Sequence, residues 1–187
     1  KTMIFCDVNS NNPEGRGKSR YRQAEAEKIM SIMDQLRSDP EFNNLSVGII
    51  TFYSRQVSVL FEEAEKHGYV VKTKDGYDVH PNFSIIDGDK ERFRIGSVDS
   101  FQGKEFDVVI LSTVRSNSIP RLDGNEKKVF GFLTLKNRLN VAFSRAKKLV
   151  ITVGDAKMFS DDYAKKYVPG LYEMCTNITN ESYGGRI

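Results

Sequence analysis

The sequence predicts an α/β fold in which a mainly parallel sheet carries helices on both faces. Short apolar runs alternate with segments of helical periodicity from the start of the chain. The run MIFCDV at residues 3–8 precedes an amphipathic stretch at 21–37, and VGIITF at 47–52 precedes another at 55–67. Strands that alternate with helices in this way build parallel sheets, whose strands read as continuous apolar runs because both faces are covered.

The later elements continue this pattern after one interruption. The run YVVKT at 69–73 leads into residues 72–92, where two Asp-Gly pairs predict an irregular excursion or hairpin. Further elements follow in the order strand, strand, helix and strand, at 93–98, 107–114, about 134–147 and 148–153. Periodicity fades after Pro169, so we expect one domain over 1–168 and a tail or connector over 169–187.

Composition favours a single intracellular domain. The chain has 187 residues, of which 39% are hydrophobic and 28% charged, as in ordinary globular proteins. Its apolar runs end after four to six residues, which predicts interior strands and no membrane partner. Two cysteines and two histidines predict neither a disulfide framework nor a metal site. We therefore expect a cytoplasmic protein in a prokaryote, or a nuclear or cytoplasmic one in a eukaryote.

Charge is unevenly distributed along the chain. The net charge is only +3, but residues 127–148 hold seven Lys and Arg and no carboxylate. A stretch that carries only positive charge favours binding of an anion such as a phosphate. The alternative is that it forms a solvated helix face.

A Gly-Lys-Ser sequence at residues 17–19 follows the first predicted strand and resembles the end of a P-loop. A P-loop requires a glycine five residues before the Gly-Lys pair, and Asn12 occupies that position. Pro13 also lacks an amide that a phosphate cradle would use. These two residues argue against an ATP site here.

The first segment with candidate binding or catalytic residues is SVDSFQGKEFDVVILSTVRSN at 97–117. Polar residues follow its predicted strand, namely Ser97, Asp99 and Ser100. With the tight turn Gln102-Gly103, they are expected to present hydroxyls and bare amides at the carboxyl edge of the sheet, where open α/β sheets bind ligands. Glu105 is expected to reach a metal-bound phosphate or a ribose. On spacing alone, a plain connector explains the same residues.

The second segment is a predicted helix within GFLTLKNRLNVAFSRAKKLVITVGD at 131–155. Its apolar residues share one side and can dock on the sheet: Leu135, Leu139, Ala142, Phe143 and Ala146. Arg138 and Arg145 are seven residues apart and project from another face, about 10 Å apart along the axis. A planar guanidinium on a rigid helix suits charge that develops on a transferred phosphate, whereas solvent-facing ion pairs are the plainer alternative.

Three motifs in order resemble the second RecA-like lobe of a superfamily 1 helicase, in the group of senataxin, aquarius and the nonsense-mediated-decay helicase. VGIITFYSRQ is similar to motif IV, whose usual Thr-Pro-Tyr and Gln are represented by Thr51, Phe52, Tyr53 and Gln56. The stretch from 98 to 117 resembles motif V without a gap, and RLNVAFSRAKK at 138–148 resembles motif VI. The resemblance covers about residues 3–155 and implies a three-layer RecA-like domain of the P-loop NTPase fold.

The same resemblance explains the Gly-Lys-Ser sequence. The family carries Ser, Asn and Glu-Ala at intervals of three before its first helix, and the matching residues here are Ser19, Arg22, Glu25 and Ala26. Lys18 is therefore interpreted as part of a second-lobe loop. The chain departs from the family pattern at four positions, which are Arg22 for Asn, Phe52 for Pro, Ser144 for Thr and Asn137 for a frequent Arg.

The resemblance also implies roles for the site residues. ATP and Mg²⁺ would be bound mainly by a first RecA-like lobe of the same parent chain, which carries the P-loop. Arg145 would be an arginine finger, Glu105 and Gly103 would face the phosphates and ribose, and Gln102 and Arg138 would support that face. Contacts to the backbone of single-stranded DNA or RNA are implied for Ser97, Asp99, Ser100, Thr51 and Tyr53.

This chain alone is then expected to be inactive and to contain no metal ligands of its own. Two other classes of protein remain open. One is a non-catalytic nucleic-acid-binding module that keeps the fold, and the other is a free-standing P-loop enzyme that uses Lys18.

Overall fold

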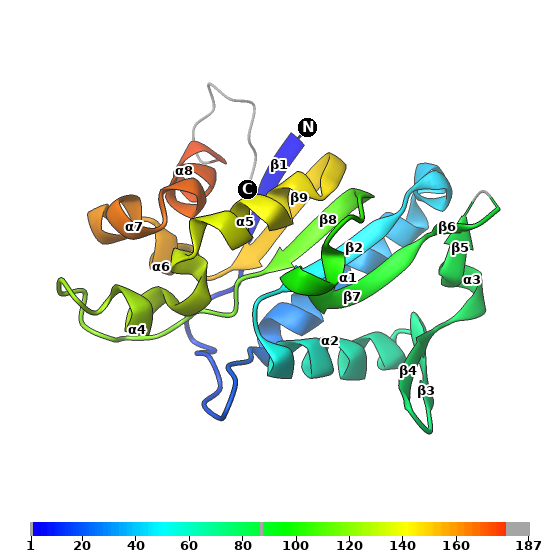
Figure 1. Cartoon of the computed structure of the whole chain (residues 1–187), viewed down its shortest axis with the longest axis horizontal. Coiled ribbons are helices and arrows are strands. Elements are labelled where there is room, and N and C mark those ends of the chain that lie inside the picture. Colours follow the sequence, from blue (N-terminus) through cyan, green and yellow to red (C-terminus); the bar gives the residue numbers. More distant parts are fainter. Residues whose placement is uncertain (1, 87, 179–187) are drawn as a thin grey trace.

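The computed structural model describes residues 2–86 and 88–178, which form three layers with a sheet at the centre (Figure 1). The sheet has five strands in the order β1-β9-β8-β2-β7, and every neighbouring pair is parallel. These strands are β1 (Thr2–Asp7), β9 (Ala146–Gly154), β8 (Phe106–Ser112), β2 (Val47–Thr51) and β7 (Phe93–Ser97). The prediction of an α/β domain with a parallel sheet is therefore confirmed.

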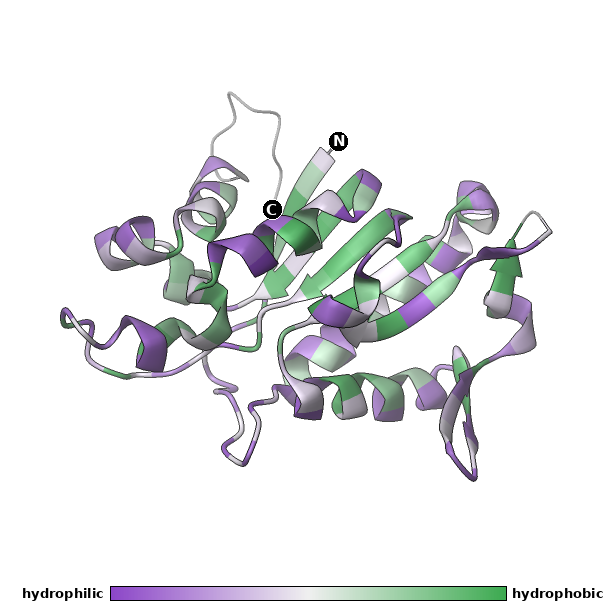
Figure 2. Cartoon of the chain, in the orientation of Figure 1, coloured by the Kyte–Doolittle hydropathy of each residue, from purple (hydrophilic) through white to green (hydrophobic). Residues whose placement is uncertain are grey.

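Because all five strands run in the same direction, the sheet has one amino edge and one carboxyl edge. The chain enters each strand at the amino edge and leaves it at the carboxyl edge. All seven residues of the central strand β8 are buried. Figure 2 shows the middle of this strand as hydrophobic, in keeping with its run Val108–Leu111, which is the pattern expected of a strand covered on both faces.

Alternation along the strands assigns side chains to the two faces. Ile49 and Ile110 are register partners on neighbouring strands and belong to one core cluster. The next pair along the strands, Ile50 and Leu111, belongs to the other cluster. The sheet thus separates two hydrophobic cores.

The first core lies under helices α1 (Gln23–Ser38) and α2 (Ser54–Lys66), with the 3-10 helix η1 (Pro40–Asn44) following α1. Helix α1 buries its apolar stripe, which consists of Ala26, Ile29, Met30, Ile32 and Met33. This spacing of three and four residues is that of a helix with one face on a sheet.

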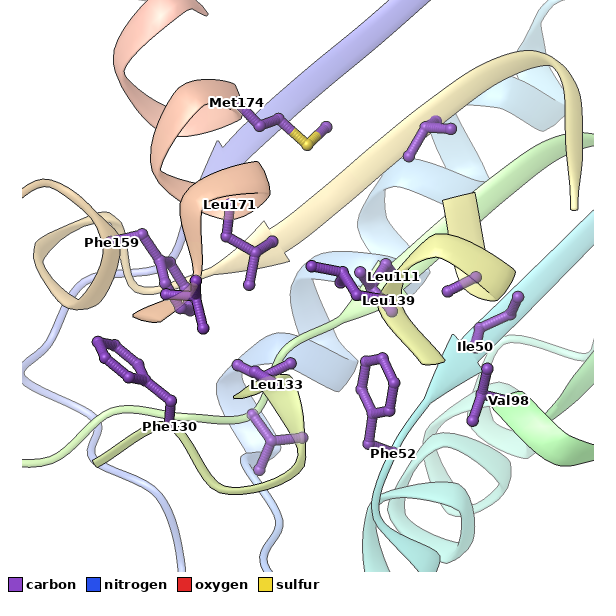
Figure 3. Packing of buried hydrophobic residues seen from close by; sticks show 14 of the residues in the cluster. Ile50, Phe52, Val98, Leu111, Phe130, Leu133, Leu139, Phe159, Leu171 and Met174 are labelled. Atoms are coloured by element: carbon purple, nitrogen blue, oxygen red, sulfur yellow. The ribbon is translucent and has the colours of Figure 1, made fainter. Parts of the chain in front are cut away.

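The second core lies under several shorter elements on the opposite face (Figure 3). They are η2 (Val98–Phe101), α4 (Glu126–Phe130), η3 (Gly131–Thr134), α5 (Lys136–Ser144), α6 (Ala156–Phe159), α7 (Asp162–Tyr167) and α8 (Pro169–Ile178). Leu139 of α5 and Leu133 of η3 are buried in this cluster with Leu111 of the sheet.

The predicted excursion at 72–92 is two small antiparallel ladders beside the main sheet. One pairs β3 (Val70–Thr73) with β4 (Gly76–Val79), and the other pairs β5 (Ile85–Ile86) with β6 (Lys90–Glu91). The short helix α3 (Pro81–Ser84) links them. Tyr69 and Phe83 anchor this excursion, since their rings lie 4.9 Å apart in the first core.

Two segments differ from their predicted structure. The helix expected at about 134–147 is shorter, because the chain becomes extended at Ala146 and enters β9. The expected tail begins with α8, whose residues Leu171, Met174 and Cys175 are buried in the second core. Its apolar residues are spaced as one helix face, a signal that the prediction of a fading pattern overlooked. Residues 179–187 of that segment lie outside the described residues.

Within the described residues, none of the helices is both long and apolar enough to cross a membrane.

Candidate functional site

Arg145 is held at the amino edge of the sheet by a backbone contact to the neighbouring strand. It caps the C-terminus of α5 and directly precedes β9. Its carbonyl accepts a hydrogen bond from the Phe106 amide at 2.9 Å, and Phe106 is the first residue of β8. This contact brings Arg145 beside the turn formed by residues 102–105.

The Arg145 guanidinium is surrounded by neutral acceptors. Its Nε donates to the Val141 carbonyl at 3.2 Å, and its Nη2 donates to the Ser144 hydroxyl at 3.0 Å. Its Nη1 lies 3.4 Å from the Lys104 carbonyl. Among the described residues, no carboxylate lies within 4.0 Å of this half-buried group. An arginine without an ion pair keeps its positive charge available for an external anion.

The turn beside Arg145 is exposed and opens toward solvent. Gly103 has φ +73° and a Cβ added to it would meet nothing within 4 Å. Glu105 lies 3.6 Å from the Lys147 ammonium, and both side chains are about half exposed. The structure therefore brings Arg145, Gly103 and Glu105 together, with Gln102 exposed at the start of the turn.

One expectation about this turn was wrong. Gln102 and Gly103 were predicted at the carboxyl edge, but they precede β8 and lie where the chain enters the sheet. The reason is that η2 crosses back over the sheet face after β7. A Cβ on Gly96 would lie 2.2 Å from Ser100 Oγ, and one on Gly48 would lie 2.6 Å from the Phe101 ring. Two strand glycines thus create the space for this crossing.

The predicted nucleic-acid residues start from the carboxyl edge. Thr51 ends β2 and Ser97 ends β7, and the two residues are register partners. The hydroxyls of Thr51 and Tyr53 are buried, and within residues 2–86 and 88–178 neither has a hydrogen-bond acceptor, whereas the Phe132 amide and the Arg115 guanidinium act on the Tyr53 oxygen. Burial raises the pKa of Tyr53, so its hydroxyl stays protonated at neutral pH. Both hydroxyls therefore remain available as donors.

Asp99 and Ser100 lie on η2, where they are exposed. Ser100 Oγ donates to the Ser97 carbonyl at 2.7 Å. Asp99 forms an ion pair with Arg138 at 2.9 Å, which ties η2 to the first turn of α5. The Arg138 guanidinium also lies 5.8 Å from the centre of the Phe132 ring. Arg138 thus contacts Asp99 and Phe132, whereas the contacts of Arg145 are to Lys104 and its own helix end.

A pocket of about 980 Å³ opens between three segments that the sequence did not connect, namely two loops and the helices α4 and η3. Tyr53 lines it, together with residues from the segments 13–20 and 115–119 and, from the segment 127–135, Lys127, Lys128, Gly131, Phe132, Thr134 and Leu135. Its cationic residues are Arg16, Lys18, Arg20, Arg115, Lys127 and Lys128. The single-sign run at 127–148 predicted the last two, but the others come from separate segments that only the fold brings together.

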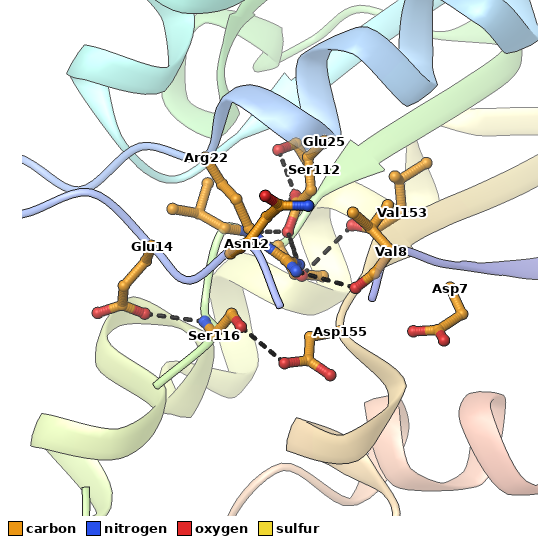
Figure 4. Close-up of polar contacts among 12 residues, drawn as sticks. Asp7, Val8, Asn12, Glu14, Arg22, Glu25, Ser112, Ser116, Val153 and Asp155 are labelled. Atoms are coloured by element: carbon orange, nitrogen blue, oxygen red, sulfur yellow. Dashed lines mark hydrogen bonds and ion pairs between the residues drawn. The ribbon is translucent and has the colours of Figure 1, made fainter. Parts of the chain in front are cut away.

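A buried network holds the loop after β1 in place (Figure 4). Arg22 is 1% exposed and donates to the carbonyls of Val8, Asn9 and Asn12 at 2.7 to 2.9 Å. It also pairs with Glu25 at 3.2 Å. Arg22, which stands where the family pattern has Asn, is therefore a buried guanidinium that donates hydrogen bonds to three loop carbonyls. Sequence reasoning missed this role because the three carbonyls carry no side-chain signal.

Glu25 connects this network to the carboxyl end of β8. It accepts a hydrogen bond from the Ser112 hydroxyl at 2.7 Å and from the Val114 amide at 2.9 and 3.0 Å. Burial raises the pKa of Glu25, and the bonds from Ser112, Val114 and Arg22 oppose that shift. Val114 has φ 69°, the sole positive φ of a non-glycine residue in the described part of the chain. The Glu25 carboxylate therefore stabilises a strained backbone at a β-branched residue.

The strained turn directs Arg115 toward the pocket. Arg115 is 3% exposed, and its Nε donates to the Val129 carbonyl at 2.9 Å while Nη2 donates to the Lys128 carbonyl. Its Nη1 pairs with Glu14 at 3.0 Å. Glu14 also accepts the Ser116 amide at 2.9 Å. The loop after β1, the loop after β8 and helix α4 are thereby fixed to one another.

Comparison with known sequences identifies the family. A family described as an AAA domain matches residues 1–157 of the chain. The chain belongs to this AAA-domain family. Several of the relatives it matches are named helicases, so the predicted resemblance to a superfamily 1 helicase lobe is confirmed.

Two curated relatives illustrate the extent of the match. The putative helicase MOV-10 of Gallus gallus is 34% identical over 167 residues, and the DNA polymerase alpha-associated DNA helicase A of Saccharomyces cerevisiae is 31% identical over 165 residues. These alignments cover 86% and 88% of this chain but 16% and 20% of the relatives, so the chain spans a fifth of their length or less. A solved C-terminal domain of a possible DNA helicase from Lactobacillus plantarum WCFS1 aligns at TM-score 0.45 and 12% identity, over 82% of this chain and 73% of that one.

Proposed function

We propose that this chain is the C-terminal motor lobe of an ATP-dependent helicase and supplies an arginine finger to a nucleotide held mainly by another lobe. The observation that carries the proposal is the convergence of Arg145, Gly103 and Glu105 at the amino edge of the sheet. Membership of the AAA-domain family and relatives named as helicases support it.

The residues at this edge fit the phosphates of ATP. Arg145 offers a planar guanidinium with no carboxylate within 4.0 Å among the described residues, and such a group stabilises charge that develops on a transferred phosphate. Gly103 leaves open space through which a phosphate or ribose can approach the backbone. Glu105 is about half exposed and can accept a ribose hydroxyl.

The residues do not fit a magnesium site of their own. In the part of the chain that the structure describes, no three acidic, His or Cys residues are grouped so as to hold a metal ion. Mg²⁺ requires several oxygen ligands in octahedral geometry. We therefore assign Mg²⁺ and most of the ATP contacts to the first RecA-like lobe, and we expect the isolated chain to be inactive.

We assign the track for single-stranded DNA or RNA to the opposite edge. Its residues in this proposal are Thr51, Tyr53, Ser97, Asp99 and Ser100. Hydroxyls and amides at this edge can hold phosphates without reading bases. In this assignment the nucleotide and the nucleic acid contact opposite ends of β8, since Glu105 precedes its first residue and Ser112 is its last.

This arrangement gives a physical link between the two sites. β8 is fully buried and pairs with both β2 and β9, so the sheet holds its two ends in a fixed relation to each other. A rotation of the lobe driven by contacts at Arg145 is therefore transmitted to the carboxyl edge. Cleft closure of this type alternates the grip on a strand and moves the motor along it.

The proposal is tested by measuring ATP hydrolysis with and without a first lobe. We expect the chain alone to hydrolyse no ATP, and the chain joined to the P-loop lobe of its own parent protein to hydrolyse ATP when single-stranded nucleic acid is added. Hydrolysis by the isolated chain that is lost in Lys18→Ala would instead support a free-standing P-loop enzyme. A joined protein that binds nucleic acid but never hydrolyses ATP would support a non-catalytic binding module.

A further inference from the structure

We propose that the pocket between residues 13–20, 115–119 and 127–135 is an additional anchoring site for single-stranded nucleic acid, in which Lys127 and Lys128 hold phosphates and a base stacks on Phe132. The inference deepens the proposed function and rests on it. The anchoring residues lie between the segments that resemble motifs V and VI, so none of the helicase motifs includes them.

The charge of the pocket favours a polyanion. Six cationic residues line it, whereas Glu14 is its one carboxylate among the described lining residues. Glu14 is engaged by Arg115 at 3.0 Å and lies 3.6 Å from Arg20. Lys127 and Lys128 are exposed, and within the described residues neither has a carboxylate within 4.0 Å. Their charges are therefore left for a ligand.

An aromatic surface adjoins these cations. Phe132 is 44% exposed, and its ring centre lies 5.4 Å from that of Tyr53. Tyr53 supports the ring from inside and Arg138 lies near it, 5.8 Å from the ring centre. An exposed ring held in one orientation is the platform on which a nucleic-acid base stacks. Leu135 is also 44% exposed and extends the apolar surface of the pocket.

A buried donor at the pocket gives independent support. Tyr53 is 4% exposed and lines the pocket; the Phe132 amide and the Arg115 guanidinium act on its hydroxyl oxygen, but within the described residues its O–H has no acceptor. Buried polar groups without a partner are rare and costly in folded proteins. Gly131 makes room for this hydroxyl, because a Cβ there would lie only 2.5 Å from it. A phosphate or sugar oxygen in the pocket would complete the bonding of this group.

The backbone around the pocket is built to hold its shape. Val114 keeps its strained φ of 69° while Arg115 binds the carbonyls of Lys128 and Val129. Strain of this kind persists where surrounding contacts fix it, often at functional sites. Arg115 thus fixes the backbone of the Lys127-Lys128 segment, while the two lysine side chains remain exposed to solvent.

The combination of these features favours a nucleic-acid strand over an acidic peptide. The carboxylates of an acidic peptide would need only the cations of the pocket, whereas this site also presents the exposed Phe132 ring beside them. Its volume of about 980 Å³ is within the range of pockets that enclose small organic ligands, and therefore admits a nucleotide unit. The cations and the ring together match alternating phosphates and bases.

The test is equilibrium binding of a labelled single-stranded oligonucleotide of about ten nucleotides to this chain, by fluorescence anisotropy at several salt concentrations. We expect Lys127→Ala/Lys128→Ala to lower the slope of log affinity against log salt by about 0.7 for each phosphate that the variant no longer neutralises. We expect Phe132→Ala to weaken binding roughly 5- to 150-fold with little change in slope, and Phe132→Trp to restore it.

A charge-matched control is Lys72→Ala/Lys74→Ala, which removes two exposed cations from the β3–β4 hairpin. We expect it to keep the affinity and slope of the wild type. The inference is overturned if the pocket variants bind the oligonucleotide as this control does. It is also overturned if the wild-type chain binds no oligonucleotide at about 50 mM salt, or if polyglutamate displaces the oligonucleotide at equal charge. The first outcome leaves the motor-lobe proposal standing, because ATP hydrolysis by the joined lobes tests that proposal separately.

Discussion

The carbonyl of Arg145 accepts a hydrogen bond from the amide of Phe106 at 2.9 Å, so the residue that caps α5 is fixed to the first residue of the central strand. The same contact determines where the Arg145 side chain starts. Its guanidinium then reaches the Lys104 carbonyl at 3.4 Å. A charged group at the amino edge is thereby linked to the fully buried central strand β8.

Gly103→Ala tests whether the turn beside Arg145 depends on its backbone conformation. Gly103 has φ +73°, in the left-handed region that costs an L side chain about 1–2 kcal/mol. We expect a loss of unfolding free energy of that size in urea denaturation. Gly17→Ala is the control, since Gly17 has an ordinary φ and the nearest atom to its added Cβ is 3.6 Å away. Equal stability of the two variants would show that the turn tolerates a side chain.

Glu25→Ala tests the buried network. The change leaves Arg22 buried without its carboxylate and frees the strained Val114 amide, so we expect a loss of about 3–5 kcal/mol in unfolding free energy. The exposed pair Arg55–Glu62, at 3.0 Å, offers a comparison. Glu62→Ala is expected to cost about 0–1 kcal/mol. A similar small loss for Glu25→Ala would contradict the role assigned to the network.

Asp107→Asn tests a pH dependence of stability. Burial acts to raise the pKa of Asp107, but bonds from the Ser46 amide and hydroxyl and from the Lys90 ammonium hold it at about 2. A carboxyl whose pKa is lower in the folded state stabilises the fold above its unfolded pKa, and this contribution is lost as pH falls toward the folded value.

The advantage of the wild type over Asp107→Asn is therefore expected to be full above about pH 4 and to shrink as the pH falls to about 2. Urea midpoints measured across this range check the expectation. A difference that stays constant with pH would mean that the ionised form of Asp107 contributes nothing to stability.

The fold could be predicted from the sequence because its strands are short apolar runs and its first two helices have a clear apolar stripe. The position of Gly103 and Glu105 at the amino edge could not be predicted, because it depends on η2 crossing the sheet face over Gly48 and Gly96. A glycine in a strand does not indicate which side chain will pack on it. The helical spacing of α8 was present in the sequence and was overlooked, whereas its packing on β1 could not be predicted, because β1 lies at the other end of the sequence.

The part of the candidate site that lies within local motifs was predictable, and the part that joins separate segments was not. Motif wording placed Arg145, Gly103 and Glu105 in one group, and the structure brings them together. The cationic pocket joins three separate segments, so no local pattern could reveal it. The role of Arg22 depends on the carbonyls of Val8, Asn9 and Asn12, which any sequence would supply.

The arginine-finger assignment is tested most directly by the ATPase rate of Arg145→Ala in the chain joined to its first lobe, with single-stranded nucleic acid present. Arg121→Ala, which removes a guanidinium paired with Asp161 at 3.0 Å, is the matched control. We predict that kcat of Arg145→Ala falls by about 10³ or more while ATP binding is largely retained, and that the control hydrolyses ATP normally. Normal turnover by Arg145→Ala would contradict the account.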